Sequence, residues 1–450
     1  MVVFILDLEQ NPLALRQTEI SVQNALPGFR SIPVDGNFAA IMNRVIEASS
    51  EPFFITLYAG EQLVQGFHSE LQDWLHDLPD ECAGICLQPA EPMSNVFPLS
   101  SFTPRGPVVW RRGAVTGKTG ESGEMSEVNV KACASGSFLT SVNLPFEQYV
   151  LLEMMYRLSS AWTWSEFRTQ SWKGGFSNSP GWRKSKEEWS CIRPIISSIP
   201  RTVSMTAIPI ITVVVCTFDN AEYLPWSIRS MLIQSFTDWE LIVIDDGSQD
   251  DTGEKLQPFA IDPRVILIRN EENRGKAFCL NKALSLARGR WLLELDADDW
   301  LTPDCLGVIA EQASSSDDTG AFYAHHYEWI ERSNKQLLFK RIELPMPEVT
   351  PERLLSSASP LAPRCYQIRI LKKLRGWWEH DPFQGRLYED VQMLIRISSR
   401  HTVKHIRKAL YHRRIRNASI TRRNQGNYER WAGWMKRELL QAENIEVNYD

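Results

Sequence analysis

Apolar residues follow two different rhythms between residues 208 and 300. Short apolar runs predict strands at 210–216, 241–244, 265–268 and 291–295. Apolar residues at helical spacing predict helices at 223–235 and 277–287. Strands that alternate with helices predict the α/β class, with a parallel sheet covered by helices on both faces. Because ligands bind at the carboxyl ends of such strands, the residues that follow each run are the first candidates for a site.

Two acidic clusters occupy these positions. Asp245-Asp246 follows the second run, and Asp296-Ala297-Asp298-Asp299 follows the fourth. In an extended chain Asp296 and Asp298 project to the same side, and packed carboxylates repel one another unless a cation neutralises them. Mg²⁺ and Mn²⁺ prefer oxygen ligands and often share them with substrate phosphates. The pattern therefore predicts a metal–diphosphate site; a solvated acidic turn is the alternative.

Residues 208–300 resemble the catalytic domain of glycosyltransferase family 2, the nucleotide-sugar-dependent transferases of the GT-A fold. The resemblance is carried by an ordered series of segments: VVVCTFD (213–219), SMLIQSF (230–236), WELIVIDDGS (239–248), NRGK (273–276), NKA (281–283) and DADD (296–299). The family often has Pro where this chain has Cys216 and Asn where it has Asp219. Neither position performs the chemistry, so the departures leave the resemblance intact.

The resemblance implies a nucleoside-diphosphate sugar donor and an acceptor that is a carbohydrate, a lipid-linked sugar or a protein. It assigns donor contacts to Thr217, Asp219, Asp246, Arg274, Lys276, Asp296, Ala297, Asp298, His412 and Arg413. Asp298 and Asp299 are the implied ligands of Mg²⁺ or Mn²⁺.

A second acidic pair, Glu389-Asp390, precedes apolar residues at helical spacing, Val391, Leu394 and Ile395. Carboxylates at a helix N-terminus are stabilised by the helix dipole even in a structural role. The resemblance implies instead that Asp390, with Glu389 beside it, is the catalytic base. It would take the proton from an acceptor hydroxyl as this attacks the anomeric carbon, with inversion at that centre.

The N-terminal part resembles a degraded copy of the same domain. Residues 39–63, placed on 277–301, share five identities in twenty-five positions, where about one or two are expected by chance. Two further blocks, around Asp35 and around Tyr149, align in the same way with a gap at the third strand. The acidic motifs become Tyr58-Ala59-Gly60-Glu61 and Val150-Leu151. The alternative is an unrelated α/β domain with similar periodicity.

These observations predict a domain order. Residues 1–165 form a degenerate, non-catalytic GT-A-like domain, and the Gly-, Ser- and Pro-rich stretch 166–206 is a linker. The catalytic GT-A domain spans 207–424, and 425–450 form a C-terminal helix. Two other functions stay open at this point: a sugar-nucleotide pyrophosphorylase, and a non-catalytic carbohydrate-binding scaffold.

Composition and charge limit the kinds of binding partner and the compartment that we expect. A 43% hydrophobic and 23% charged chain is a folded protein, and its net charge of −6 disfavours general nucleic-acid binding. No apolar run reaches the roughly 20 residues of a membrane span, and eight cysteines without a Cys-x-x-Cys pair fit reduced thiols in the cytoplasm. The basic stretch Lys404 to Arg423 is typical of a solvated face. It also fits an anionic acceptor or peripheral contact with the inner face of a membrane, and homo-oligomers are compatible with the sequence.

Overall fold

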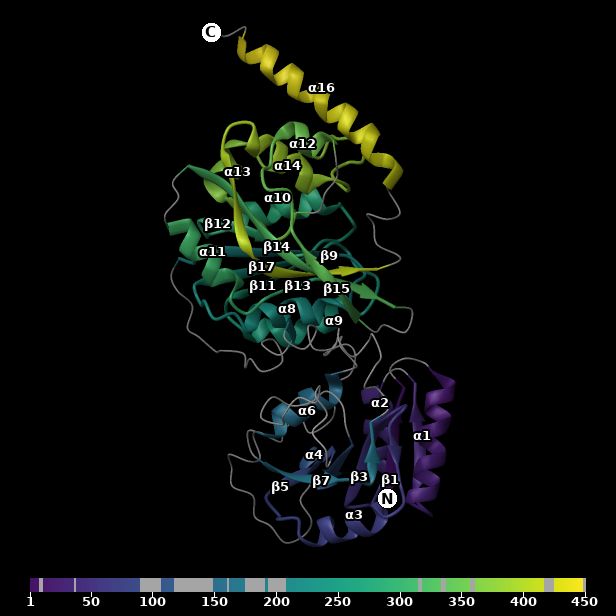
Figure 1. Cartoon of the computed structure of the whole chain (residues 1–450). Coiled ribbons are helices and arrows are strands. Elements are labelled where there is room, and N and C mark those ends of the chain that lie inside the picture. The colour runs from purple at the N-terminus through teal and green to yellow at the C-terminus, as the bar shows by residue number, and fades with distance from the viewer. Residues whose placement is uncertain are drawn as a thin grey trace. The chain divides into compact units, whose positions relative to one another are not determined.

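The computed structural model describes residues 1–7, 11–35, 38–89, 107–116, 149–159, 162–174, 191–192, 208–314, 318–332, 337–356, 361–416 and 425–447. The chain divides into two compact units, one up to Ser197 and one from Ser198 onward (Figure 1).

The second unit is built on a nine-stranded sheet. Its parallel half has the order β11-β10-β9-β12, with bounds Ile211–Thr217 (β9), Trp239–Asp245 (β10), Val265–Arg269 (β11) and Trp291–Glu294 (β12). These strands match the predicted apolar runs. All residues of β10 and β12 are buried, which is why both strands read as near-continuous apolar runs, 241–244 and 291–293, rather than as alternating sequences. The prediction of an α/β class is confirmed.

The other half of this sheet is mixed. It continues from β12 through β16 (Arg364–Gln367), β14 (Thr319–Glu331), β17 (Thr402–Ile415) and β13 (Trp300–Leu301), and β15 (Leu337–Glu343) pairs with β14. Strand β16 is antiparallel to both neighbours, whereas β14 and β17 are parallel. The register of β12 and β16 places Arg364 opposite Glu294, so a charged pair is set at the carboxyl end of β12.

Helices cover both faces of the sheet (Figure 1). Core residues on one face come from α8 (Leu224–Leu232), α9 (Thr252–Leu256) and α11 (Cys305–Ser314). Those on the other come from α10 (Lys276–Leu286), α12 (Pro351–Ser356), α13 (Ile368–Lys373), α14 (Glu389–Ser398) and α16 (Tyr428–Val447). Two short 3₁₀ helices, Gln257–Ile261 and Gln425–Asn427, precede β11 and α16. Helix α16 matches the predicted C-terminal helix.

The first unit has a six-stranded sheet of order β2-β1-β3-β6-β5-β7 and a small pair, β4 with β8. Its strands are Val2–Leu6 (β1), Arg30–Val34 (β2), Phe53–Tyr58 (β3), Gln62–Leu63 (β4), Cys82–Pro89 (β5), Val108–Arg111 (β6), Thr163–Thr169 (β7) and Trp172–Lys173 (β8). Its helices are Pro12–Ala25 (α1), Phe38–Ala48 (α2), Phe67–His76 (α3), Arg112–Thr116 (α4) and Val150–Leu158 (α6).

The two sheets follow one plan. Replacing β2-β1-β3-β6-β5-β7 by β10-β9-β12-β16-β14-β17 preserves the chain order of the strands and every parallel or antiparallel pairing. Even an irregularity is shared: the β5–β7 register shifts between Cys82 and Gly84, and the β14–β17 register shifts between Thr319 and Ala321. Within the described residues the first unit has no counterpart of β11, as the sequence gap predicts.

The first unit extends past the predicted boundary at residue 165. Strand β7 crosses that position and pairs with β5 along its whole length, so it belongs to the sheet rather than to a linker. Strand β8 also lies within the predicted linker and pairs with β4. Most of the remaining stretch, 175–190 and 193–207, lies outside the described residues.

Candidate active site

Three neighbouring strands of the second unit end at the same edge of the sheet. Strands β9, β10 and β12 are parallel and finish with Thr217, Asp245 and Glu294. The chain then turns at 296–299, and the Asp299 backbone N–H donates to the Asp296 carbonyl at 3.1 Å. The predicted acidic turn therefore lies where α/β sheets bind ligands.

Residues predicted for the nucleotide pocket surround the ends of β9 and β10. Asp246 is buried and accepts hydrogen bonds from the Asn270 side chain and from the backbone N–H groups of Arg274 and Gly275, at 2.7–3.0 Å. Asp219 has a left-handed backbone (φ 51°) and accepts from the Gln249 N–H at 2.7 Å. Both carboxylates thus hold loops together at this edge.

The Thr217 hydroxyl is different. It is buried and has no hydrogen-bond partner among the described residues. An unsatisfied buried hydroxyl is costly, so this group is available to a polar ligand at the end of β9.

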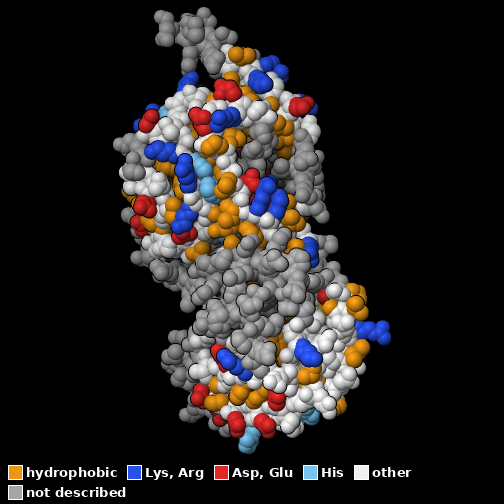
Figure 2. All heavy atoms as spheres, viewed as in Figure 1, with side chains coloured by type: hydrophobic (Ala, Val, Ile, Leu, Met, Phe, Trp, Pro, Cys, Tyr) orange, Lys and Arg blue, Asp and Glu red, His pale blue; other side chains and the backbone are white. Residues whose placement is uncertain are grey.

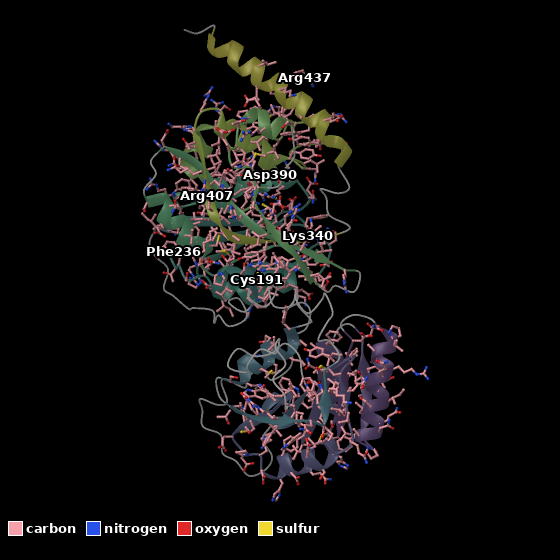
Figure 3. The ribbon with its side chains drawn as sticks, in the orientation of Figure 1. Cys191, Phe236, Lys340, Asp390, Arg407 and Arg437 are labelled. Carbon is pink, nitrogen blue, oxygen red and sulfur yellow. The ribbon has the colours of Figure 1, made fainter. Side chains whose placement is uncertain are left out.

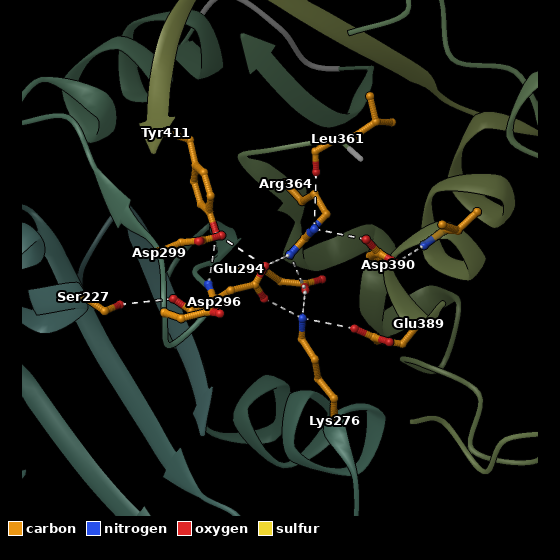
Figure 4. Close-up of polar contacts among 12 residues, drawn as sticks. Ser227, Lys276, Glu294, Asp296, Asp299, Leu361, Arg364, Glu389, Asp390 and Tyr411 are labelled. Carbon is orange, nitrogen blue, oxygen red and sulfur yellow. Dashed lines mark hydrogen bonds and ion pairs between the residues drawn. The ribbon is translucent and has the colours of Figure 1, made fainter. Parts of the chain in front are cut away.

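Two cations join the acidic turn to the second acidic pair (Figure 4). The Lys276 ammonium lies 2.7 Å from an Asp296 carboxylate oxygen and 3.1 Å from Glu389. The Arg364 guanidinium lies 3.0 Å from the other Asp296 oxygen and 3.0 Å from Asp390. Because Arg364 is 68 residues from Asp296 and 26 from Asp390 in sequence, only the fold brings these groups together.

A further carboxylate, Glu294, lies beneath this cluster. It is almost completely buried, and both cations are 3.6 Å from one of its oxygens. Burial raises its pKa, although Arg364 and Lys276 oppose that effect. The positive charges of Lys276 and Arg364 are thus shared among four carboxylates, those of Glu294, Asp296, Glu389 and Asp390.

Burial and charge shift the pKa values of Asp296 and Glu389 in opposite directions. Burial alone would raise the pKa of Asp296, but Lys276 and Arg364 outweigh it and hold that pKa well below its usual range. Burial, with Asp390 and Glu294 nearby, raises the pKa of Glu389 to about 7, even though Lys276 lowers it. Asp296 is therefore a firm anion, whereas Glu389 can exchange a proton near neutral pH.

The last two carboxylates of the turn differ in exposure. Asp298 is partly exposed and is held by Arg416 at 2.5 Å. Asp299 is buried and accepts from the Tyr411 hydroxyl at 2.8 Å and from the Arg414 backbone N–H at 2.7 Å. Burial, with Asp298 and Asp296 beside it, raises the pKa of Asp299 well above its usual value. Asp299 thus fastens β17 to the turn.

The turn suits a divalent cation that is shared with a ligand. Mg²⁺ is typically bound through one or two carboxylates together with substrate phosphates. Asp298 is a partly exposed carboxylate that could supply that contact, whereas Asp296 is already paired with Lys276 and Arg364. Within the described ranges, no group of three or more His, Cys, Asp or Glu side chains is arranged to hold a metal ion by itself. The donor set therefore fits a metal that is completed by a diphosphate.

The prediction that His412 contacts the diphosphate is wrong. Its ring is completely buried, stacks on Trp300 and Tyr327, and accepts a hydrogen bond from the Trp329 indole N–H at 3.0 Å. Burial lowers its pKa to about 3, so the ring is neutral and closed off from any ligand.

Three other residues predicted to contact the donor have partners outside the cluster. Arg413 pairs with Glu328 at 3.3 Å, and the Arg274 guanidinium stacks on the Phe278 ring. The Ala297 side chain packs in the core, so only its backbone can meet a ligand. Lys276 is the predicted basic residue that does reach the carboxylates.

The basic residues along strand β17 differ in exposure. Lys404, Arg407 and Lys408 are exposed, and Figure 2 shows Lys and Arg side chains on the visible face of the second unit. Farther along, Arg414 is buried beside the turn and Arg416 contacts Asp298. Arg407 thus lies on the surface strand, while Asp390 lies at the start of α14 (Figure 3).

Sequence reasoning missed the residues that connect the site. Arg364 and Glu294 belong to no quoted motif, and Tyr411 and Arg416 lie in the basic stretch without a role of their own. For Glu294 a signal existed, because a carboxylate inside an otherwise apolar strand has to be paired when buried. No comparable signal marks Arg364, since an isolated arginine in a short strand has many ordinary roles.

Comparison with known proteins identifies the middle of the chain. Residues 212–373 match the family described as Glycosyl transferase family 2. Chondroitin synthase of Escherichia coli is 27% identical over 215 residues, covering 47% of this chain and 30% of that protein. The putative teichuronic acid biosynthesis glycosyltransferase TuaG of Bacillus subtilis (strain 168) is 39% identical over 92 residues, covering 20% of this chain and 36% of that protein. The chain thus spans about a third of these relatives' length.

Comparison with solved structures finds two further likenesses over part of the chain. S. aureus TarS 1–349 is 22% identical with a TM-score of 0.38, covering 45% of this chain and 60% of that chain. The mannosyltransferase PcManGT from Pyrobaculum calidifontis, in complex with GDP-Man and Mn²⁺, is 16% identical with a TM-score of 0.38, covering 55% and 70%. The family match confirms the resemblance predicted for 208–300. Among the described helices, none combines the length and apolar character that crossing a bilayer requires.

Proposed function

We propose that this chain, whose residues 212–373 form a family 2 glycosyltransferase domain, transfers a sugar from a nucleoside-diphosphate sugar to an acceptor hydroxyl with inversion. The observation that carries the proposal is the cluster in which Lys276 and Arg364 join Asp296 to Glu389 and Asp390. It sets a donor-side carboxylate beside a candidate base at the carboxyl edge of the sheet.

Asp390 is the proposed base. Its side chain is 24% exposed, whereas that of Glu389 is 8% exposed and is bound to Lys276. Asp390 takes the proton of the acceptor hydroxyl, the oxygen attacks the anomeric carbon, and the bond to the diphosphate breaks. Attack from the face opposite the leaving group inverts the configuration. Arg364 holds Asp390 in place through a single charged hydrogen bond.

The donor occupies the edge formed by β9, β10 and β12 in this proposal. The Thr217 hydroxyl and the loop held by Asp246 line the nucleotide, and Lys276 lies where it can meet the diphosphate. Asp298 would hold Mg²⁺ or Mn²⁺, and the predicted role of Asp299 as a second ligand stays a prediction. When bound, the cation neutralises charge on the departing diphosphate.

The acceptor is proposed to be a carbohydrate. Relatives of this domain are named as a chondroitin synthase and a teichuronic acid biosynthesis glycosyltransferase, so the extension of a surface polysaccharide is the class of reaction they favour. No feature of the described residues selects one sugar.

Release of nucleoside diphosphate tests this function. The full chain is incubated with a panel of UDP- and GDP-sugars, with Mn²⁺, with Mg²⁺ or with a chelator. We expect slow, metal-dependent hydrolysis of one donor, and a loss of about 100-fold or more in Asp298→Asn, because an amide cannot balance the cation. Arg407→Ala, at an exposed position of β17, is the matched control. If the Asp298→Asn variant keeps wild-type release, the metal assignment fails.

We further propose that the first unit is a degenerate copy of this domain. The shared strand plan and the shared register shift support it. Positions equivalent to the acidic motifs hold Tyr58 to Glu61 and Val150-Leu151. A unit without those carboxylates has no seat for a metal-bound diphosphate.

A further inference from the structure

The residue that precedes the two acidic side chains of α14 has an unusual backbone. Tyr388 has φ 62° and ψ 20°, in the left-handed region, and it begins the helix without a side-chain cap. A bulky residue rarely adopts this conformation. Such strain persists only where the surrounding structure enforces it, and it is concentrated at functional sites.

The equivalent residue of the first unit shows that the sequence does not require this conformation. Helix α6 also begins after a tyrosine, Tyr149, yet its φ is −109°. Val150 and Leu151 follow there, in place of Glu389 and Asp390. The same residue type at the same place in the same topology is therefore relaxed where no carboxylate follows it.

Aromatic packing enforces the strained conformation in the second unit. The Tyr388 ring lies edge-on to Tyr428 with centroids 5.1 Å apart, and it is tilted against Trp431 at 5.3 Å. Phe383 closes a third side at 6.2 Å. Tyr428 and Trp431 belong to the first turn of α16, and Trp431 is completely buried. The C-terminal helix thus clamps the residue from which α14 begins.

The orientation at this helix start decides where the two carboxylates point. Successive side chains of a helix are about 100° apart, yet Glu389 reaches Lys276 at 3.1 Å and Asp390 reaches Arg364 at 3.0 Å. Both contacts are made only if the helix begins in one orientation, and the peptide of Tyr388 sets it.

We propose that Tyr388 is a positioning residue for Asp390, and that the first turn of α16 holds it in its left-handed conformation. This inference rests on the proposed function, because it assumes that Asp390 is the base. It extends that function by making the C-terminal helix a part of the catalytic unit.

Three substitutions at one position test it in the full chain. Tyr388→Phe keeps the ring, Tyr388→Ala removes it and leaves a residue that avoids the left-handed region, and Tyr388→Gly removes it but adopts that region freely. We expect turnover of the best panel donor to fall about 30-fold in Tyr388→Ala, as misplacement of a reacting group does. Tyr388→Gly should recover most of this loss, and Tyr388→Phe should stay within about twofold of the wild type.

Donor affinity separates positioning from general damage. Calorimetric titration of UDP or GDP with Mn²⁺ should give dissociation constants within about twofold for all three variants, since Asp390 acts on the acceptor. Leu440→Ala, at an exposed position of the same helix α16, is the control and should match the wild type. If Tyr388→Gly is no better than Tyr388→Ala, or if affinity falls together with turnover, the inference is overturned.

A readout that needs no activity separates this inference from the proposed function. Hydrogen exchange of the amides of 389–392 should quicken in Tyr388→Ala and not in Tyr388→Gly or Leu440→Ala. If the wild-type chain hydrolyses no panel donor, the proposed function fails and exchange alone decides whether α16 and Tyr388 set the start of α14. Equal exchange in all variants would overturn that coupling.

Discussion

Helices α2 and α10 begin at equivalent places in the two units, but α2 begins with Phe38 and α10 with Lys276. The same difference is found at five further positions of the site. At each of them the first unit has an uncharged residue where the second unit has a charged one. The pairs are Thr56 and Glu294, Tyr58 and Asp296, Val108 and Arg364, Val150 and Glu389, and Leu151 and Asp390. In the first unit all of these side chains are buried.

This difference shows that the fold does not need the charges. Burying ions costs several kcal/mol each, and their attraction offsets that cost only partly, whereas buried apolar side chains stabilise the fold directly. The first unit has the same strand plan with uncharged side chains at these positions. Six charged groups retained at one edge of the second unit are therefore better explained by chemistry than by stability.

The backbone of the turn that follows β3 in the first unit and β12 in the second is also alike. In the first unit the Glu61 N–H donates to the Tyr58 carbonyl at 3.0 Å, and in the second the Asp299 N–H donates to the Asp296 carbonyl at 3.1 Å. The Glu61 carboxylate turns inward and accepts from the Tyr58 N–H at 2.8 Å. The turn is thus present in both units, although among the described residues the cluster of carboxylates is present only in the second.

The largest expected effect separates Asp390, the proposed base, from Leu151 at the corresponding position of the first unit. Asp390→Asn should lower turnover by about 10³-fold, because an amide cannot accept the acceptor's proton. Affinity for the nucleoside diphosphate and Mn²⁺ should change by less than about twofold. Initial rates and calorimetry on the same preparation measure both. A parallel loss of affinity would indicate that Asp390 only begins a helix.

The second prediction removes the cation between the two acidic motifs. Arg364→Met should leave Asp390 without its cation and Asp296 with Lys276 alone. Breaking a buried pair costs about 3 kcal/mol of stability, and turnover should fall about 100-fold. The matched change in the first unit, Val108→Ala, should lower stability by removing buried methyl groups and leave turnover unchanged. Urea unfolding and initial rates of both variants test this. Equal turnover in the two variants would remove the distinction between the units.

The third prediction concerns the number of donor sites. If the first unit is degenerate, titration of the full chain with the nucleoside diphosphate and Mn²⁺ should give one site per chain. The Asp298→Asn variant should then show weak binding or none, since no second carboxylate cluster remains to hold the cation. A stoichiometry of two, or metal-dependent binding that survives this substitution at full strength, would mean that the first unit binds donors.

The smallest effect concerns acid. Burial lowers the pKa of His412 to about 3 and that of His326 to about 4, below the ordinary 6.5. Between pH 6.5 and these values the unfolded chain binds protons at these two histidines that the folded chain does not, so their contribution to stability falls as pH falls. Each group contributes at most about 1.4 kcal/mol per pH unit. The two histidines of the first unit, His68 and His76, are not buried.

Amide hydrogen exchange at pH 7 and pH 5, corrected for the intrinsic rate, measures the acid dependence of stability in each unit separately. Protection of β14 and β17 should fall in acid more than protection of β1 and β3. In His412→Phe the acid loss should be smaller, because one titrating group is gone. An equal acid loss in both units would show that other groups dominate.

The sequence by itself determined the local elements and the site's carboxylates. Four apolar runs became β9 to β12, because strands that are largely buried read as near-continuous apolar runs. The acidic turn and the Glu389-Asp390 pair are contiguous in sequence, so they were visible without a fold. The likeness of 39–63 to 277–301 anticipated the shared topology of the two sheets.

Only the tertiary structure decided the partners of these residues. Arg364 reaches Asp296 through the antiparallel register of β12 and β16, and no local pattern encodes a register between strands so distant in sequence. His412 lies in a basic stretch and was predicted to contact the donor. Its place on β17 directs the ring into an aromatic core instead, because side chains alternate between the faces of a strand. The left-handed Tyr388 likewise depends on rings of α16. Periodicity in the sequence specifies which residues are buried, whereas packing between distant elements decides which side chains they contact.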